Sequence, residues 1–333
     1  MAEPLVSDPF SPLVGQSQAV SLLWAAVRHQ RIAPAYLFVG APGIGRRLAA
    51  ECFAELLLGS RTSAERDRTL RQRIRDRNHP DLFWVEPTYL HQGQLLTAAE
   101  AEAHNLKRRS PPQIRLEQIR QIAQFLGRPP LEAQRSLVVV DAANSMAEAA
   151  ANGLLKTLEE PGAATIILIA PSVDSLLPTL VSRCQQIPFR RLSPEAIAQV
   201  LTQNGQEELL QYPDVLALAQ GSPGDAIASW QQRQALPPDI LEAIAAPPAT
   251  LRQALDVGRQ LAALPAETQL WLIDYWQQTL WQTTGNSAYL HPLESARRAL
   301  RSFAQPRLVW EVALMTMLAS RSSGDRPTHS AMQ

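Results

Sequence analysis

The chain has 333 residues, 46% of them hydrophobic, which predicts folded domains, two or three in number, rather than a single core. Its formal net charge is zero and its pI is near 7.0. This balance excludes a protein that holds nucleic acid alone through a strongly basic surface, so any nucleic-acid contact must be local or shared.

Apolar runs alternate with helical patterns in the first half of the chain. In chain order we predict a helix at 20–27, a strand at 35–39, a helix at 48–58 and strands at 81–85, 136–140 and 165–170. An amphipathic helix is predicted at 114–126, and a further helix ends before Pro161. Strands that are apolar throughout and alternate with helices indicate a parallel sheet covered on both faces, so the first domain is predicted to be α/β.

Two segments of this half lack such a pattern. Residues 61–77 carry seven arginines diluted by acidic residues, which predicts a solvated helix or a mobile insertion, with a nucleic-acid patch as the alternative. Residues 88–112 are polar without a clear period, and we predict a long loop there.

No comparable strand follows Ser193. The remainder predicts helices, punctuated by Gly221–Gly224 and by two proline pairs. Its apolar stretches at 270–281 and 308–318 are expected to serve mostly as an internal core, with some side chains left for a partner. Residues 321–333 are polar and are expected to form a disordered tail.

The segment Gly40–Arg47 reads G-A-P-G-I-G-R-R and has the glycine frame of a phosphate-binding P-loop. A simple turn is the alternative. The predicted strand before the segment and the predicted helix after it favour the P-loop, because strand, glycine loop and helix form the context that this motif requires.

The side chains of a working P-loop are missing. Arg46 stands where a lysine reaches the terminal phosphate, and Arg47 stands where a Ser or Thr hydroxyl binds Mg²⁺. A planar guanidinium does not replace a compact ammonium, and a cation at the second position opposes the metal.

Val138–Asp141 has the form of a Walker B strand, whose terminal aspartate helps to hold Mg²⁺. Ala142 follows where an acidic residue would polarise water. An aspartate that caps a helix is the alternative for Asp141. The candidate nucleotide-binding residues are therefore those of a degenerate, inactive site in which residual ATP binding stays open, namely Gly40, Gly43, Gly45, Arg46, Arg47 and Asp141.

Only two cysteines occur, Cys52 and Cys184, which excludes a disulfide framework and a four-cysteine zinc site. No apolar run approaches the roughly 18 residues of a membrane span. The N-terminus lacks a basic start followed by an apolar stretch, so a cytoplasmic protein without membrane contact is expected.

Three stretches resemble the clamp-loader branch of the AAA+ family. They are Val14-Gly15-Gln16, the segment from Asn152 to Pro161, and Leu177–Cys184, which ends in Ser-Arg-Cys. The resemblance implies that Arg183 is an arginine finger, which reaches the ATP bound by a neighbouring subunit. A guanidinium suits that role because its planar fork matches phosphate oxygens, although a lone arginine after a helix is more often a solvated residue.

Two further positions separate the members of this branch. Hydrolysing subunits carry a sensor arginine in the segment that here reads Gly221-Ser222-Pro223-Gly224, and a first sensor where this chain has Ser172. The absence of the sensor arginine resembles the non-hydrolysing subunit of the bacterial DNA polymerase III clamp loader. The segments 78–82 and 305–310 are similar to it as well, so the resemblance runs along nearly the whole chain.

The resemblance implies an AAA+ domain at 1–190, a helical lid at 191–236 and a helical collar at 237–320, followed by the tail at 321–333. It implies a heteropentamer with ATP-hydrolysing gamma/tau subunits and a delta subunit, which places a sliding clamp on primed DNA. The family usually has a four-cysteine zinc module that the stretch 59–78 lacks, so no metal is expected. The alternatives are an active P-loop ATPase and an inactive adaptor unrelated to replication.

Overall fold

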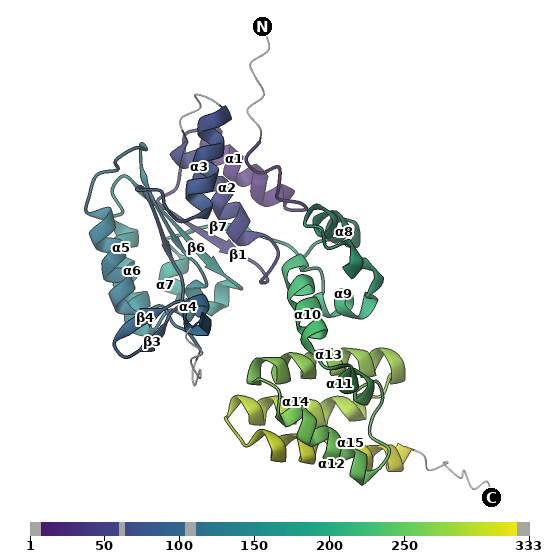
Figure 1. Ribbon diagram of the computed structural model, residues 1–333. Coiled ribbons are helices and arrows are strands. Elements are labelled where there is room, and N and C mark those ends of the chain that lie inside the picture. The colour runs from purple at the N-terminus through teal and green to yellow at the C-terminus, as the bar shows by residue number, and fades with distance from the viewer. Residues whose placement is uncertain (1–7, 60–63, 104–110, 325–333) are drawn as a thin grey trace, which may run out of the picture. The chain divides into compact units, whose positions relative to one another are not determined.

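The computed structural model describes residues 8–59, 64–103 and 111–324, and it divides the chain into two compact units, Met1–Val200 and Leu201–Gln333 (Figure 1). Each unit is described by itself below. The tail expected at 321–333 lies largely outside the described residues, although the last helix, α15 (Pro306–Gly324), reaches into it. The start of the arginine-rich stretch, residues 61–63, also lies outside them.

The first unit is built on a parallel sheet of five strands within the described residues, in the order β2-β5-β6-β1-β7. In sheet order the strands are β2 (Leu82–Val85), β5 (Ser136–Val140), β6 (Ala164–Ala170), β1 (Ala35–Val39) and β7 (Gln185–Pro188). The three central strands are almost entirely buried, as their continuous apolar sequences predict. The predicted α/β fold is confirmed.

Helices cover both faces of this sheet (Figure 1). One layer contains α1 (Ser17–Arg28), α2 (Arg46–Leu58) and α3 (Ala64–Arg75), and the other contains α5 (Leu116–Leu126) and α6 (Glu148–Glu159). Leu154 and Leu158 of α6 and Ile119 and Ile122 of α5 are buried in one core with the sheet residues. The short helix α7 (Pro178–Val181) precedes β7, and α8 (Pro194–Gln203) follows it.

The prediction of a long loop at 88–112 is wrong. Its described part contains a hairpin of β3 (Tyr89–His91) and β4 (Gln94–Leu96), followed by α4 (Ala98–Ala103). Gln92 and Gly93 form the turn, and both have positive φ angles, of 49° and 81°. This conformation is typical of the tightest hairpin turns, in which glycine is favoured. Residues 104–110 lie outside the described residues.

The strand β7 and the start of helix α5 also differ from the sequence prediction. The strand β7 was not predicted, because its sequence Gln-Gln-Ile-Pro is half polar and it lies at the edge of the sheet, where one side of the strand faces solvent. Helix α5 begins at Leu116 rather than at Ile114, whose backbone forms a bridge to Met146 instead.

The described part of the second unit contains helices and no strand, as predicted for the residues after Ser193. Its helices are α9 (Pro213–Ala219), α10 (Pro223–Ala235), α11 (Pro238–Ala243), α12 (Leu251–Ala262), α13 (Ala266–Thr284), α14 (Leu290–Arg301) and α15. Prolines stand at or next to the first position of several of them, where a missing N–H costs nothing. None of the described helices is long and apolar enough to cross a membrane.

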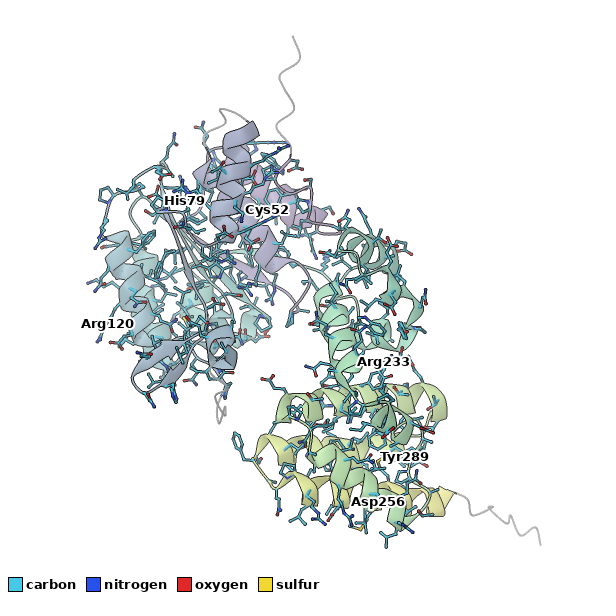
Figure 2. All side chains as sticks on the ribbon, in the orientation of Figure 1. Cys52, His79, Arg120, Arg233, Asp256 and Tyr289 are labelled. Carbon is cyan, nitrogen blue, oxygen red and sulfur yellow. The ribbon has the colours of Figure 1, made fainter. Side chains whose placement is uncertain are left out.

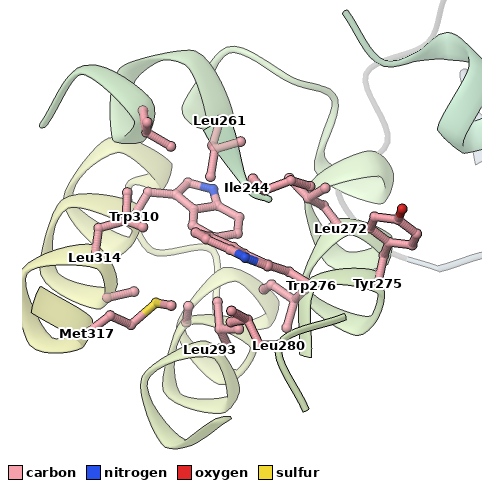
Figure 3. Packing of buried hydrophobic residues seen from close by; sticks show 14 of the residues in the cluster. Ile244, Leu261, Leu272, Tyr275, Trp276, Leu280, Leu293, Trp310, Leu314 and Met317 are labelled. Carbon is pink, nitrogen blue, oxygen red and sulfur yellow. The ribbon is translucent and has the colours of Figure 1, made fainter. Parts of the chain in front are cut away.

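The core of the second unit gathers around two fully buried tryptophans, Trp276 of α13 and Trp310 of α15 (Figure 3). The Trp310 Nε1–H donates to the Gln269 side-chain oxygen at 2.8 Å, and the Gln269 amide donates to the Leu264 carbonyl at 2.7 Å. Most of the apolar stretches at 270–281 and 308–318 is therefore internal core, as expected. Leu308 and Val312 nevertheless stay more than half exposed, at 56% and 58%.

A polar contact joins the segment predicted as a lid to the segment predicted as a collar, and the residues that form it all lie in the second unit. The Tyr275 hydroxyl of α13 donates to Asp214 of α9 at 2.7 Å and accepts from Arg233 of α10 at 3.3 Å. The boundary near residue 236 stays a prediction.

Candidate functional site

The predicted P-loop connects β1 to the start of α2, and its backbone requires glycine at two positions. A Cβ on Gly40 would lie 2.7 Å from the carbonyl oxygen of Phe189, closer than real Cβ contacts allow. A Cβ on Gly45 would lie 2.7 Å from Leu13, and the φ angle of Gly45 is 100°, which side chains rarely adopt. The loop therefore keeps the backbone for which its glycines are needed.

The stretch Val14-Gly15-Gln16 fixes this loop through the side chain of Gln16. Gln16 is buried, and its side-chain amide donates to the carbonyl of Ile44 at 3.1 Å and to that of Arg190 at 2.7 Å. The Arg190 N–H returns a bond to the Gln16 oxygen at 3.0 Å. One side chain thus fixes the loop to the segment that follows β7.

A pocket of about 570 Å³ opens between the loop and the end of β5. A volume of this size is typical of small-molecule sites. The loop lines it with Pro42, Gly43, Gly45, Arg46, Arg47 and Leu48, and the opposite wall consists of Asp141, Ala142, Asn144 and Pro171. Most of the predicted nucleotide-site residues therefore meet at one place, with Gly40 at the base of the same loop.

Arg47 pairs with Asp141 in this pocket. Its Nε lies 2.9 Å from Asp141 Oδ2, and its Nη2 lies 3.7 Å from a carboxylate oxygen of Glu86. The other Asp141 oxygen accepts the backbone N–H of Ala142 at 2.8 Å. The carboxylate that would bind Mg²⁺ is therefore already occupied by a guanidinium and an amide, so the residues present do not fit a metal ion.

Glu86 and Trp84 complete the surroundings of this ion pair, and no sequence pattern pointed to either of them. The Arg47 guanidinium lies 5.9 Å from the centre of the Trp84 ring, and the Arg77 guanidinium lies 3.3 Å from it on the same indole. Arg77 also contacts Glu51 at 3.0 Å. The Trp84 ring is thus within cation–π distance of two guanidinium groups, one of which belongs to the degenerate loop.

Several arginines of the stretch at 61–77 form ion pairs with carboxylates of the same chain. Arg71 binds Glu55 at 2.7 Å, and Arg73 binds Glu132 at 2.7 Å. Its described residues 64–75 form helix α3, in agreement with a helix as one of the two predicted possibilities. Because Arg71 and Arg73 pair with carboxylates of the same chain, the pairing favours a structural role for these two arginines over a nucleic-acid contact.

The predicted arginine finger lies on a different segment, in the turn between α7 and β7. The Arg183 side chain is 37% exposed. Its Nη2 donates to Glu159 Oε1 at 2.6 Å, and its Nη1 donates to the carbonyl of Thr179 at 3.0 Å. Arg183 is not among the described residues that line the loop pocket. After these two hydrogen bonds the guanidinium keeps three further N–H groups.

The predicted sensor positions have structural roles. Ser222 caps helix α10, since its hydroxyl accepts the N–H of Asp225 at 3.1 Å. Pro223 is the first residue of that helix, so an N-terminal turn of ordinary capping geometry stands where a sensor arginine was expected in hydrolysing subunits. Ser172 precedes a short turn, and its carbonyl accepts the Ser175 hydroxyl at 2.6 Å.

Two family models match the chain. A model described as DNA polymerase III, delta subunit, matches residues 15–193, which is more than half of the chain. A model described as cyanobacterial DNA polymerase III delta prime, C-terminal domain, matches residues 195–317. The chain belongs to the DNA polymerase III delta-prime family.

Individual delta-prime proteins agree with this assignment. The chain is 33% identical to the DNA polymerase III subunit delta' of Bacillus subtilis over 185 residues, which cover 55% of the chain and 50% of the relative. It is 35% identical to the subunit delta' of Pseudomonas aeruginosa over 199 residues, which cover 57% of the chain and 54% of the relative. The chain thus spans about half the length of these relatives.

A solved structure with an overall likeness is a DNA polymerase III gamma subunit-related protein from Thermotoga maritima. It is 18% identical, and the alignment covers 93% of this chain and 100% of that chain with a TM-score of 0.46.

Among the described residues of this delta-prime family member, neither cysteine belongs to a group that could bind a metal ion. Cys52 is buried in α2 (Figure 2), and burial, followed by the nearby Glu55 and Glu51, raises the pKa of its thiol to about 12. His79 is also buried, and its Nδ1 accepts the N–H of Asp81 at 3.1 Å. Among the residues that the structure describes, no three His, Cys, Asp or Glu side chains form a group that could hold a metal ion. The absence of structural zinc stays a prediction.

Proposed function

We propose that this chain is a non-hydrolysing subunit of a replicative clamp loader. It lends Arg183 to the ATP bound by a neighbouring subunit, and the complex then places a sliding clamp on primed DNA. Its partners are the ATP-hydrolysing gamma/tau subunits and a delta subunit of DNA polymerase III in the cytoplasm. Membership in the delta-prime family supports this assembly.

The observation that carries the proposal is the 2.9 Å contact between Arg47 and Asp141. A hydrolysing site needs Mg²⁺ between the loop hydroxyl and the Walker B aspartate, because the metal neutralises charge that develops on the phosphates. Here the hydroxyl is replaced by a guanidinium that binds the aspartate itself. The chain therefore has no ATPase activity of its own in this proposal, and any nucleotide in the pocket is bound without catalysis.

The position of Arg183 supports the second half of the proposal. An arginine finger must lie at the surface, outside the pocket of its own subunit, with N–H donors that can reach foreign phosphate oxygens. Arg183 is 37% exposed and lies on a short turn that is anchored by the fully buried Leu180. The proposal assigns subunit contacts to the collar at 237–320, where Leu308 and Val312 are exposed and apolar.

The test is reconstitution of the clamp loader with its gamma/tau and delta partners around wild-type chain, Arg183→Ala or Arg120→Ala. Arg120 is a matched control, because it is an arginine on α5 with a side chain that is 65% exposed. We expect Arg183→Ala to leave assembly intact. At the served site, which is the ATP site of the neighbouring subunit that Arg183 reaches, it should slow DNA-stimulated hydrolysis by about 10³-fold or more. Arg120→Ala is expected to match the wild type. Equal hydrolysis by all three assembled complexes would refute the proposal.

Two measurements separate the rival functions. ATP turnover by the pure, isolated chain that Arg46→Ala abolishes would identify an active P-loop ATPase instead. Failure of the wild-type chain to enter a complex with the polymerase subunits, measured by size-exclusion chromatography with light scattering, would favour an adaptor outside replication.

A further inference from the structure

Glu159 forms a contact with the arginine finger that the sequence resemblance does not assign. It is the last residue of α6, and its Oε1 accepts Arg183 Nη2–H at 2.6 Å. A second contact comes from the carbonyl of Thr179, which accepts Arg183 Nη1–H at 3.0 Å. The guanidinium is thus held from two elements, α6 and α7, before any partner is present.

Both anchors are themselves fixed by the core. Leu158, the neighbour of Glu159, is buried in the core of the first unit. Leu180, three residues before Arg183, is buried in the same core. The Ser182 hydroxyl closes that turn by donating to the Thr179 carbonyl at 3.1 Å. The backbone at Glu159 and at Arg183 is already fixed by this packing. The contact with Glu159 therefore restricts mainly the side-chain torsions of Arg183.

We infer that Glu159 is a positioning residue, which holds the Arg183 fork ready for a phosphate of the neighbouring subunit. The inference rests on the proposed function of Arg183. Glu159 accepts one N–H of the guanidinium and the Thr179 carbonyl accepts another, so three of its five N–H groups remain to bind phosphate. A carboxylate that held the finger in an inactive state would instead cover the fork with a bidentate pair, as Glu132 engages both terminal nitrogens of Arg73.

Positioning helps because an arginine side chain has many rotamers. When the fork is held before the neighbour binds ATP, less freedom is lost as the transition state forms. The effect belongs to the rate of hydrolysis rather than to ATP affinity, since the finger acts on charge that develops during the reaction. Glu159 therefore affects kcat and leaves KM for ATP unchanged.

The test compares reconstituted complexes that contain Glu159→Ala, Glu159→Gln or Glu160→Ala. Glu160 is a matched control, because it is the next residue and is also exposed. We expect Glu159→Ala to lower the DNA-stimulated kcat at the served site by about 10- to 100-fold. Glu159→Gln keeps most of the rate, since an amide oxygen still accepts the hydrogen bond, and Glu160→Ala matches the wild type.

A kcat for Glu159→Ala at or above the wild-type value, in a series where Arg183→Ala is slow, would overturn the inference and leave the proposed function standing. If Arg183→Ala is also unchanged, the proposed function fails as well. A second measurement addresses the contact itself in the isolated full chain. We expect the Arg183 guanidinium NMR signal, assigned with Arg183→Lys, to lose its restricted motion in Glu159→Ala and to keep it in Glu159→Gln. Identical signals in the wild type and in Glu159→Ala would overturn the inference without any complex.

Discussion

Replacing Arg47 with threonine tests whether its guanidinium closes the metal position. In the wild-type chain the Arg47 Nε lies 2.9 Å from Asp141 Oδ2. A Mg²⁺ ion bound to this oxygen would lie about 2.1 Å from it, and therefore no more than about 5 Å from the Arg47 Nε, with about 4 Å as a representative separation. Threonine removes the charge and supplies the hydroxyl that a P-loop uses for the metal.

Coulomb repulsion sets the size of the expected effect. Two unit charges about 4 Å apart interact by about 1 kcal/mol in bulk water and by about 4 kcal/mol near a protein surface. A divalent ion beside Arg47 is therefore repelled by about 2–8 kcal/mol. Because every 1.4 kcal/mol changes an affinity about tenfold, the lower limit corresponds to about 30-fold.

The assay is isothermal titration of ATP into the wild type and Arg47→Thr, with Mn²⁺ and with EDTA. We expect Mn²⁺ to strengthen ATP binding at least about 30-fold more in the variant than in the wild type. Arg120→Thr serves as the control and is expected to match the wild type. Turnover is not expected, because Ala142 offers no acid. An equal metal dependence in the wild type and Arg47→Thr would refute the interpretation of this ion pair.

Two further predictions concern stability. Gln269→Ala leaves the buried Trp310 Nε1–H and the Leu264 carbonyl without their partner, and should lower the free energy of unfolding by about 1–3 kcal/mol in urea titrations, whereas Ala at the exposed Gln260 should not. Burial would raise the pKa of Asp81, but three backbone N–H groups hold it below its ordinary value. The stability that Asp81 contributes is therefore present above the unfolded-state pKa and lost as pH falls, so the advantage of the wild type over Asp81→Asn should shrink from about pH 5 to about pH 2. A pH-independent difference would contradict this.

The sequence was sufficient for the loop and the central sheet. Gly40–Arg47 could be identified because its glycines are required by the packing of the backbone, such as the close approach of Gly40 to Phe189, and not by a ligand. The strands at 35–39, 136–140 and 165–170 could be predicted because they are buried on both faces and therefore apolar throughout.

Elements with weaker patterns were missed for physical reasons. The edge strand β7 needs fewer apolar residues, since it pairs with a neighbour on one side only. The hairpin of β3 and β4 is short, and Gly93 in its turn is its main sequence signal. One glycine in a polar segment is not enough to predict a hairpin. In both cases the strand does not pack fully on a core, so its sequence lacks the apolar pattern from which a strand can be predicted.

Pairing between distant side chains could not be read from the sequence at all. Arg47 was expected to oppose a metal, but its contact with Asp141 depends on how the end of β5 faces the start of α2. Glu159 was visible only as part of a family-like segment, and its contact with Arg183 depends on the packing of α6 beside α7. Such contacts arise from tertiary geometry, which gives no periodic signal along the chain.

Clamp loading by the reconstituted complex tests the central claim most directly. The measurement is the rate at which fluorescent clamp is transferred to primed DNA by complexes that contain wild-type chain or Arg183→Ala, both confirmed as fully assembled. The account predicts that Arg183→Ala loads clamp far more slowly at saturating ATP, with the Arg120→Ala complex at the wild-type rate. Loading by the assembled Arg183→Ala complex at the wild-type rate would contradict it.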